Sequence, residues 1–187
     1  MIRNVSIFLW LSIIIGAISA YFIWPESFAP AAIVRLLTDF KGLALLVFTV
    51  FSMLRGLTLL PSTPLVIAGT LAFPGDPWIV LAISILGIIA SSTMIYCFSD
   101  VLGFSEFFET RKPAAIAKIR GRLEQPAGLV LVFLWAFFPL VPTDAVCYVA
   151  GSSRMNFLKF IAAIAAGELI LCSFYIFSGR YAVDLFK

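Results

Sequence analysis

Uncharged, largely apolar stretches recur along the whole chain. They cover residues 4–25, 56–75, 77–99 and 125–143. A run of about 18 or more such residues is long enough to cross the hydrocarbon core of a bilayer as a helix. The pattern therefore predicts an all-α integral membrane protein.

Three stretches have the pattern of plain spanning helices, namely residues 5–24, 77–99 and 157–179. Trp24 and Trp78 stand at the ends of the first two, where interfacial aromatic residues anchor membrane spans. The first stretch also resembles a secretory signal, but its apolar run continues to Trp24. That run is longer than a typical signal core, which favours a retained helix.

A short amphipathic helix is predicted after the first span. Ile33, Leu36, Leu37 and Phe40 recur at helical spacing, while the residues between them include charged and polar ones. Such a helix suits the membrane surface, because one face can lie in lipid and the other in water.

Prolines interrupt two further apolar stretches, residues 42–73 and 126–153. Proline removes a backbone donor and its ring clashes with the preceding turn, so each stretch is predicted to be a broken helix. The two breaks repeat one pattern, a PxxP motif followed by an Ala-Gly pair. Its members are Pro61, Pro64, Ala68 and Gly69 in the first copy, and Pro139, Pro142, Ala150 and Gly151 in the second.

We interpret the two broken stretches as re-entrant helical hairpins that enter the bilayer from opposite faces. The fold then has about three full spans and two opposed hairpins in an inverted repeat. Transporters with this symmetry place their substrate site near the bilayer midplane, where the broken helices meet. The repeat is the case for re-entrant hairpins, because two full crossings would give the same charge distribution.

Basic residues are distributed as the positive-inside rule expects if the N-terminus is cytoplasmic. The cytoplasmic set is Arg3, Arg111, Lys112, Lys118, Arg120, Arg122, Arg154 and Lys159, and the outer set is Arg35, Lys41, Arg180 and Lys187.

Three ionisable residues lie in apolar surroundings and are candidates for function. Glu168 stands near the middle of the last span and is either a proton-titrating or headgroup-coordinating site, or a structural hydrogen-bonding group. Arg55 precedes the first break, and its planar fork suits either a lipid phosphate or an ion pair, for which Asp144 is the expected partner. Asp144 can equally be the N-cap of the returning half-helix.

The backbone at the two breaks completes the predicted lipid path. Its residues are Arg55, Pro61, Pro64, Gly69, Pro139, Pro142, Asp144, Tyr148 and Gly151.

Composition argues against other classes of function. Hydrophobic residues make up 62% of the 187 positions and charged ones 12%, against about a quarter charged in soluble domains. The chain has no histidine, and it shows no nucleophile elbow, phosphate loop or metal-ligand cluster, so we expect no enzyme, cofactor or metal. Its three cysteines read as reduced, buried thiols, and the net charge of +3, without a basic stripe, does not suit nucleic acid.

Residues 138–151, followed by Met155, Phe160 and Gly167, resemble the second signature of the DedA/VTT superfamily, also called SNARE-associated Golgi proteins. Residues 61–69 resemble the partner signature, and the resemblance covers about residues 40–180.

The resemblance implies a bacterial or organellar membrane protein that translocates or scrambles lipids, including phospholipids and a polyprenyl-phosphate carrier. Many family members carry an arginine shortly before the first proline of the second signature, where this chain has Trp135 and Ala136, and the DedA branch has one where this chain has Pro142. These departures place the chain nearer the VTT-like branch.

The leading hypothesis is a flippase or scramblase of membrane lipids in a bacterial cytoplasmic (inner) membrane, with Glu168 as a candidate for proton coupling. Alternatives are a proton-coupled carrier of a small solute and a non-transporting assembly factor for membrane proteins. The sequence leaves open whether the chain acts alone or as a homo-oligomer.

We expect one membrane domain over residues 1–187, with parts 1–40 (span and amphipathic helix), 41–100 (first hairpin and span), 101–125 (charged cytoplasmic segment) and 126–187 (second hairpin and span).

Overall fold

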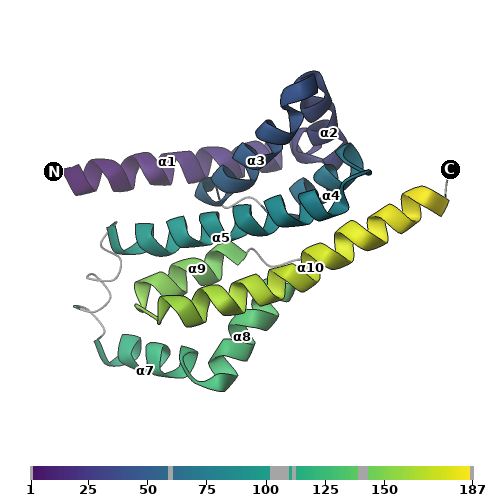
Figure 1. Cartoon of the computed structure of the whole chain (residues 1–187). Coiled ribbons are helices and arrows are strands. Elements are labelled where there is room, and N and C mark those ends of the chain that lie inside the picture. The colour runs from purple at the N-terminus through teal and green to yellow at the C-terminus, as the bar shows by residue number, and fades with distance from the viewer. Residues whose placement is uncertain (1, 59–60, 102–109, 111–112, 139–142, 186–187) are drawn as a thin grey trace.

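Helices make up the secondary structure throughout the described part of the chain, with no strand there (Figure 1). The computed structural model describes residues 2–58, 61–101, 110, 113–138 and 143–185. The α-helices are α1 (Ile2–Ile23), α2 (Pro30–Asp39), α3 (Ala44–Leu54), α4 (Thr63–Ala72), α5 (Pro77–Val101), α7 (Pro113–Leu123), α8 (Pro126–Phe137), α9 (Thr143–Ser152) and α10 (Phe157–Leu185). The 3₁₀ turns are η1 (Pro25–Phe28), η2 (Lys41–Leu43) and η3 (Arg55–Thr58).

Two long helices, α5 and α10, lie side by side through the centre of the molecule (Figure 1). Each contains an apolar stretch long enough to cross a membrane, Pro77–Ser99 and Phe157–Gly179, at the bounds that the sequence predicts for the second and third spans. Where the first span was predicted, the structure has the helix α1.

Four short helices form two pairs that double back beside the long ones. The helices α3, α4, α8 and α9 contain between 10 and 12 residues. At 1.5 Å per residue each is about 15–18 Å long, roughly half the thickness of a hydrocarbon core. The first pair turns at the predicted break, where Pro61 precedes α4 and Pro64 lies in its first turn.

A seam of small residues joins the first pair to α5. Gly56 at the tip leaves no room for a Cβ against Ser91, and Gly87 on α5 leaves none against Ser52 of α3. The step from Ser52 to Gly56 matches the step from Gly87 to Ser91, four residues in the same chain direction. Helix α3 therefore runs parallel to α5 at close approach. Small residues spaced by four are a common means of close helix packing in membranes.

The second pair repeats this arrangement with α10. Gly167 of α10 approaches the backbone of α8 at Phe133 and the side chain of Ala136. Helix α8 therefore packs on α10 as α3 packs on α5. The second member of this pair, α9, packs against α5. Figure 1 shows the pair α3–α4 at one end of the molecule and the pair α8–α9 reaching in from the opposite end.

The predicted amphipathic helix is present as α2, and it contributes to the protein core. Leu37 is 1% exposed, whereas Leu36 and Phe40 are 39% and 46% exposed. Helix α2 packs on α3 and α4, so its buried edge covers the outer side of the first pair.

Part of the charged central segment forms α7, which is tied to the start of α10. The Nε of Arg120 donates a hydrogen bond to the carbonyl of Ser153, and the backbone N–H of Asn156 donates to Glu124 Oε1 at 3.0 Å. The prediction that all three cysteines are buried is wrong for Cys97, which is exposed near the end of α5. An exposed position suits a thiol as well as a buried one, so apolar neighbours in sequence did not determine its burial.

Candidate functional site

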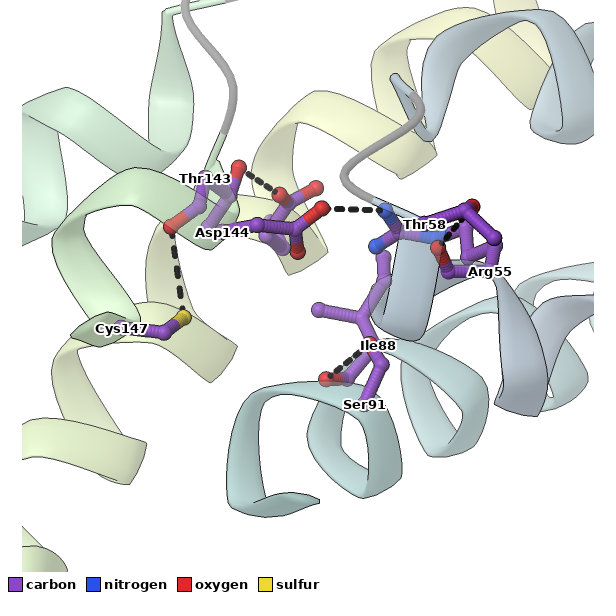
Figure 2. Close-up of polar contacts among 8 residues, drawn as sticks. Arg55, Thr58, Ile88, Ser91, Thr143, Asp144 and Cys147 are labelled. Atoms are coloured by element: carbon purple, nitrogen blue, oxygen red, sulfur yellow. Dashed lines mark hydrogen bonds and ion pairs between the residues drawn. The ribbon is translucent and has the colours of Figure 1, made fainter. Parts of the chain in front are cut away.

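A buried ion pair connects the two helix pairs. Helix α3 ends at Leu54, and the chain tightens into η3, in which Thr58 Oγ1 donates to the carbonyl of Arg55 at 2.6 Å. This turn holds Arg55 at the tip of the first pair. Its Nη1 lies 3.8 Å from Oδ2 of Asp144 on α9, and the two side chains are 8% and 2% exposed (Figure 2).

Asp144 belongs to the first turn of α9, which begins at Thr143. Its carboxylate points toward Arg55, as Figure 2 shows, and Oδ1 has no hydrogen-bond donor among the described residues. A carboxylate in this position also benefits from the positive end of the helix dipole. Among the described residues, no backbone N–H donates the N-cap hydrogen bond that the alternative interpretation of Asp144 required.

Glu168 lies in the middle of α10 and is fully buried. Thr143 Oγ1 donates a hydrogen bond of 2.6 Å to Glu168 Oε1, and the Sγ of Cys172, one turn further along α10, lies 3.9 Å from Oε2. The strong hydrogen bond comes from the residue next to Asp144. Glu168 is therefore connected to the ion pair through the first turn of α9.

These residues form one group, which we call the buried polar cluster: Arg55, Thr143, Asp144 and Glu168. It holds one guanidinium and two carboxyl groups in an apolar interior, where charges interact much more strongly than in water. Cys147, whose Sγ donates to the carbonyl of Thr143 at 3.2 Å, lies beside it. The cluster sits where the two helix pairs meet, against the middle of α5 and α10.

A cavity of about 170 Å³ lies next to the cluster, between the N-terminal segment and the first helix pair. Its wall is mostly apolar, and Arg55 forms part of it. The lining residues are Tyr21, Ser27, Phe28, Ile33, Leu36, Leu37, Phe51, Arg55, Pro61, Pro64 and Leu65. Two prolines of the predicted path, Pro61 and Pro64, thus lie beside Arg55 on this cavity.

The other predicted path residues lie elsewhere. Tyr148 is half-buried, one turn after Asp144, and its ring meets that of Trp10 edge to face at a centroid distance of 5.2 Å. Gly69 packs against Val80 near the start of α5, and Gly151 packs against Ser99 near its end. The path residues Pro139 and Pro142 lie outside the described residues.

The two glycines are therefore packing positions, far from Arg55 along the axis of α5. Gly56, next to Arg55, lies at the level of Ser91, which is about 16 Å from Val80 and about 12 Å from Ser99 along a helix. In this structure these glycines do not border the polar cluster. Gly69 leaves room for the side chains of Phe48 and Val80, and Gly151 allows close contact with the backbone of α5 at Tyr96.

Sequence reasoning did not select Thr143 as a site residue, although its hydroxyl links Asp144 to Glu168. The contact joins positions 25 residues apart, so no helical spacing could have revealed it. Among the described residues, no group of three or more histidine, cysteine or acidic side chains could hold a metal ion.

Comparison with known families gives one match. The family model described as the VTT domain matches residues 60–181, which extend from just before α4 to near the end of α10. No curated protein and no solved structure matches the chain.

Proposed function

This chain belongs to the VTT domain family, the domain of the DedA/SNARE-associated Golgi proteins, and we propose that it is a flippase or scramblase of membrane lipids. The family and the two apolar long helices support an integral membrane protein. The observation that carries the lipid proposal is the buried ion pair between Arg55 and Asp144, where the two helix pairs meet.

The two helix pairs act, in this proposal, as hairpins that enter the bilayer from opposite faces and turn back near its middle. Helices of 10 to 12 residues are too short to cross a core of about 30 Å. The backbone groups freed at the proline breaks have to face protein or water, because lipid offers no hydrogen-bond partner. The region between the hairpin tips is then polar and thin.

A lipid headgroup needs such a region because its charge is costly to move through hydrocarbon. An ionic side chain alone at the bilayer centre costs at least about 2.5–3.5 kcal/mol, and a phosphate-bearing headgroup meets the same obstacle. Arg55 offers a planar guanidinium that can bind two phosphate oxygens at once. Because Asp144 lies 3.8 Å away, beyond hydrogen-bonding distance, a phosphate can replace it without breaking a hydrogen bond.

In the proposed cycle the headgroup phosphate displaces Asp144 from Arg55, passes the tips and leaves when Asp144 returns. The exchange keeps one negative group beside the guanidinium throughout, and the displaced Asp144 takes up a proton, which it releases on its return, so that its buried carboxylate is not left as an uncompensated charge. Glu168, held by Thr143, can accept or release a proton when the charge beside it changes.

The fully buried Glu168 also favours a second candidate function, a proton-coupled carrier of a small solute. Intramembrane carboxyl groups are characteristic of proton relays in transporters. The two candidates differ in the molecule that moves, so one reconstitution with separate lipid and solute measurements can separate them.

The test uses the purified protein in liposomes that contain a headgroup-labelled phospholipid or a labelled polyprenyl phosphate. Lipid movement is followed by quenching of the outer leaflet with a membrane-impermeant reductant, with and without a pH gradient. The proposal expects faster movement than in empty liposomes. Arg55→Gln should reduce the rate at least tenfold, whereas Arg35→Gln, which changes an exposed arginine of α2, should leave it unchanged.

No acceleration over empty liposomes for either lipid, in any gradient, would exclude lipid transport. Proton movement coupled to solute uptake in the same vesicles would then favour the small-solute carrier. Absence of both activities would leave the third hypothesis, an assembly factor for membrane proteins. The location in a bacterial cytoplasmic membrane remains a prediction, which labelling of the protein in fractionated source cells would test.

A further inference from the structure

The cavity beside Arg55 has the composition of a site for an amphiphile. Among its described lining residues Arg55 carries the only formal charge, and most of the others are aliphatic, aromatic or proline. One charged group at the edge of an apolar wall matches a ligand with one ionic group and an apolar chain.

The burial of the wall is graded from the mouth inward. Leu36 and Phe51 are 39% and 49% exposed, whereas Leu37 is 1% exposed. Arg55 has a side chain that is 8% exposed. The cavity is therefore open at one edge and closed at its base, so a chain can enter from the side of the protein and remain partly outside it.

The volume limits what can enter. An engineered apolar cavity of about 150 Å³ holds benzene, so a cavity of 170 Å³ holds about six carbon atoms. This is the first part of an acyl chain, the part nearest to a headgroup. The rest of the chain would leave through the open edge into the surrounding lipid.

We propose that this cavity binds a membrane lipid with an anionic phosphate headgroup, the phosphate on Arg55 and the headgroup end of one acyl chain in the cavity. This proposal rests on the proposed lipid transport and names the part of the substrate that the protein holds. The charge of Arg55 selects the anionic group, and the apolar wall selects the chain.

Most of the wall comes from residues that precede position 60, where the match to the VTT domain begins. Tyr21, Phe28 and Leu37 come from the end of α1, from η1 and from α2. The N-terminal segment therefore supplies the chain-binding half of the site, and the tip of the first helix pair supplies the head-binding half. The N-terminal segment therefore determines which acyl chains the site prefers.

Binding is tested with the full-length protein in detergent, by native mass spectrometry or calorimetry with three probes. Dioctanoyl phosphatidate carries both parts of the ligand, dioctanoylglycerol lacks the phosphate, and inorganic phosphate lacks the chains. We expect the phosphatidate to bind at least tenfold more tightly than either of the others. Inorganic phosphate binding equally well would mean an anion site alone, and dioctanoylglycerol binding equally well would mean an apolar cavity alone; either result overturns the proposal.

A matched pair of variants locates the chain. Leu36→Trp fills the mouth of the cavity, and Leu45→Trp adds the same ring at a position of α3 that is also 39% exposed and does not line it. Losing the burial of about two methylene groups corresponds to about tenfold weaker phosphatidate binding for Leu36→Trp. Equal affinities for the two variants would contradict the assigned cavity, even if both remain folded.

The same variants distinguish this proposal from the proposed function. If the wild-type protein binds phosphatidate selectively but moves no lipid in liposomes, transport fails and the binding site stands. If it moves lipid and Leu36→Trp does so at the same rate and with the same chain-length preference as Leu45→Trp, the chain site fails and transport stands.

Discussion

Replacement of Asp144 by asparagine tests whether the ion pair holds the two helix pairs together. The substitution keeps the shape of the side chain and removes its charge, and arginine cannot lose its own proton in response. At the observed separation of 3.8 Å and an effective dielectric constant of about 20, the attraction that is lost is about 4 kcal/mol. Removing one partner of a buried pair typically costs about 3–5 kcal/mol.

We expect a loss near the lower end of that range, about 3 kcal/mol. The pair is not hydrogen-bonded at this distance, and Arg55 lines a cavity into which its guanidinium can turn after the substitution. The reciprocal variant, Arg55→Met, leaves the carboxylate unpaired and should also destabilise the fold. The double variant removes both charges together, so it should recover at least about 2 kcal/mol relative to the sum of the two single changes.

The free energy of unfolding can be measured by SDS titration in mixed micelles, with the fluorescence of the four tryptophans as the signal. If the two single effects simply add in the double variant, the side chains do not interact and the reasoning from the 3.8 Å contact is wrong. The double variant also separates stability from function, because it should fold and yet move lipid no faster than the background.

Three further predictions concern packing, hydrogen bonding and accessibility. Gly87→Ala places a Cβ 2.7 Å from a backbone oxygen of α3 and should destabilise the fold by about 1–3 kcal/mol in the same titration, whereas Gly16→Ala, with open space around it, should be neutral or slightly stabilising. Thr143→Val removes the donor to Glu168 and should cost about 0.6–1.7 kcal/mol; an unchanged midpoint would show that the bond contributes nothing. In detergent, a maleimide should modify Cys97 in the folded protein and the other two cysteines only after denaturation, which mass spectrometry of digests can show; equal labelling rates would contradict the burial described above.

The long helices could be predicted because their signal is local. The stretch 77–99 has no charged residue and 157–179 has only Lys159 and Glu168, so length and hydrophobicity identified both, and the structure gives the same bounds. The signal for the break before α4 is also local, because proline is common in the first turn of a helix and Pro64 lies in the first turn of α4. These features required no knowledge of what each helix touches.

The site could be predicted only in part, because its contacts are between distant residues. Arg55 and Asp144 were selected because each is costly in an apolar stretch, and a buried charge implies a partner. Gly69 and Gly151 were selected by the repeat, yet both are packing positions at opposite ends of α5. A short motif shows that two segments share a geometry, but it does not show which of its residues face the site.

The Ala-Gly pairs have a physical role that the repeat could not separate from function. Gly151 lets α9 approach the backbone of α5 at Tyr96, and Gly69 of α4 leaves room for the side chains of Phe48 and Val80. A binding site and a tight helix crossing both require small residues, and a single sequence contains no information that distinguishes them. The resemblance of residues 138–151 to a family signature supplied the functional prediction, and the VTT domain match confirms the family.

The seam between α3 and α5 determines which movements are available to the molecule. Backbones that touch through Ser52, Gly56, Gly87 and Ser91 cannot slide without collision, so α3 and α5 form one stiff arm. The contact of Gly167 with α8 gives the second arm the same stiffness. The two arms are themselves closely joined, because Gly151 lets α9 approach the backbone of α5 at Tyr96 and α10 packs on both α4 and α5. Site-directed spin labels on α3 and α5, and equally on α5 and α9, should therefore report narrow distance distributions.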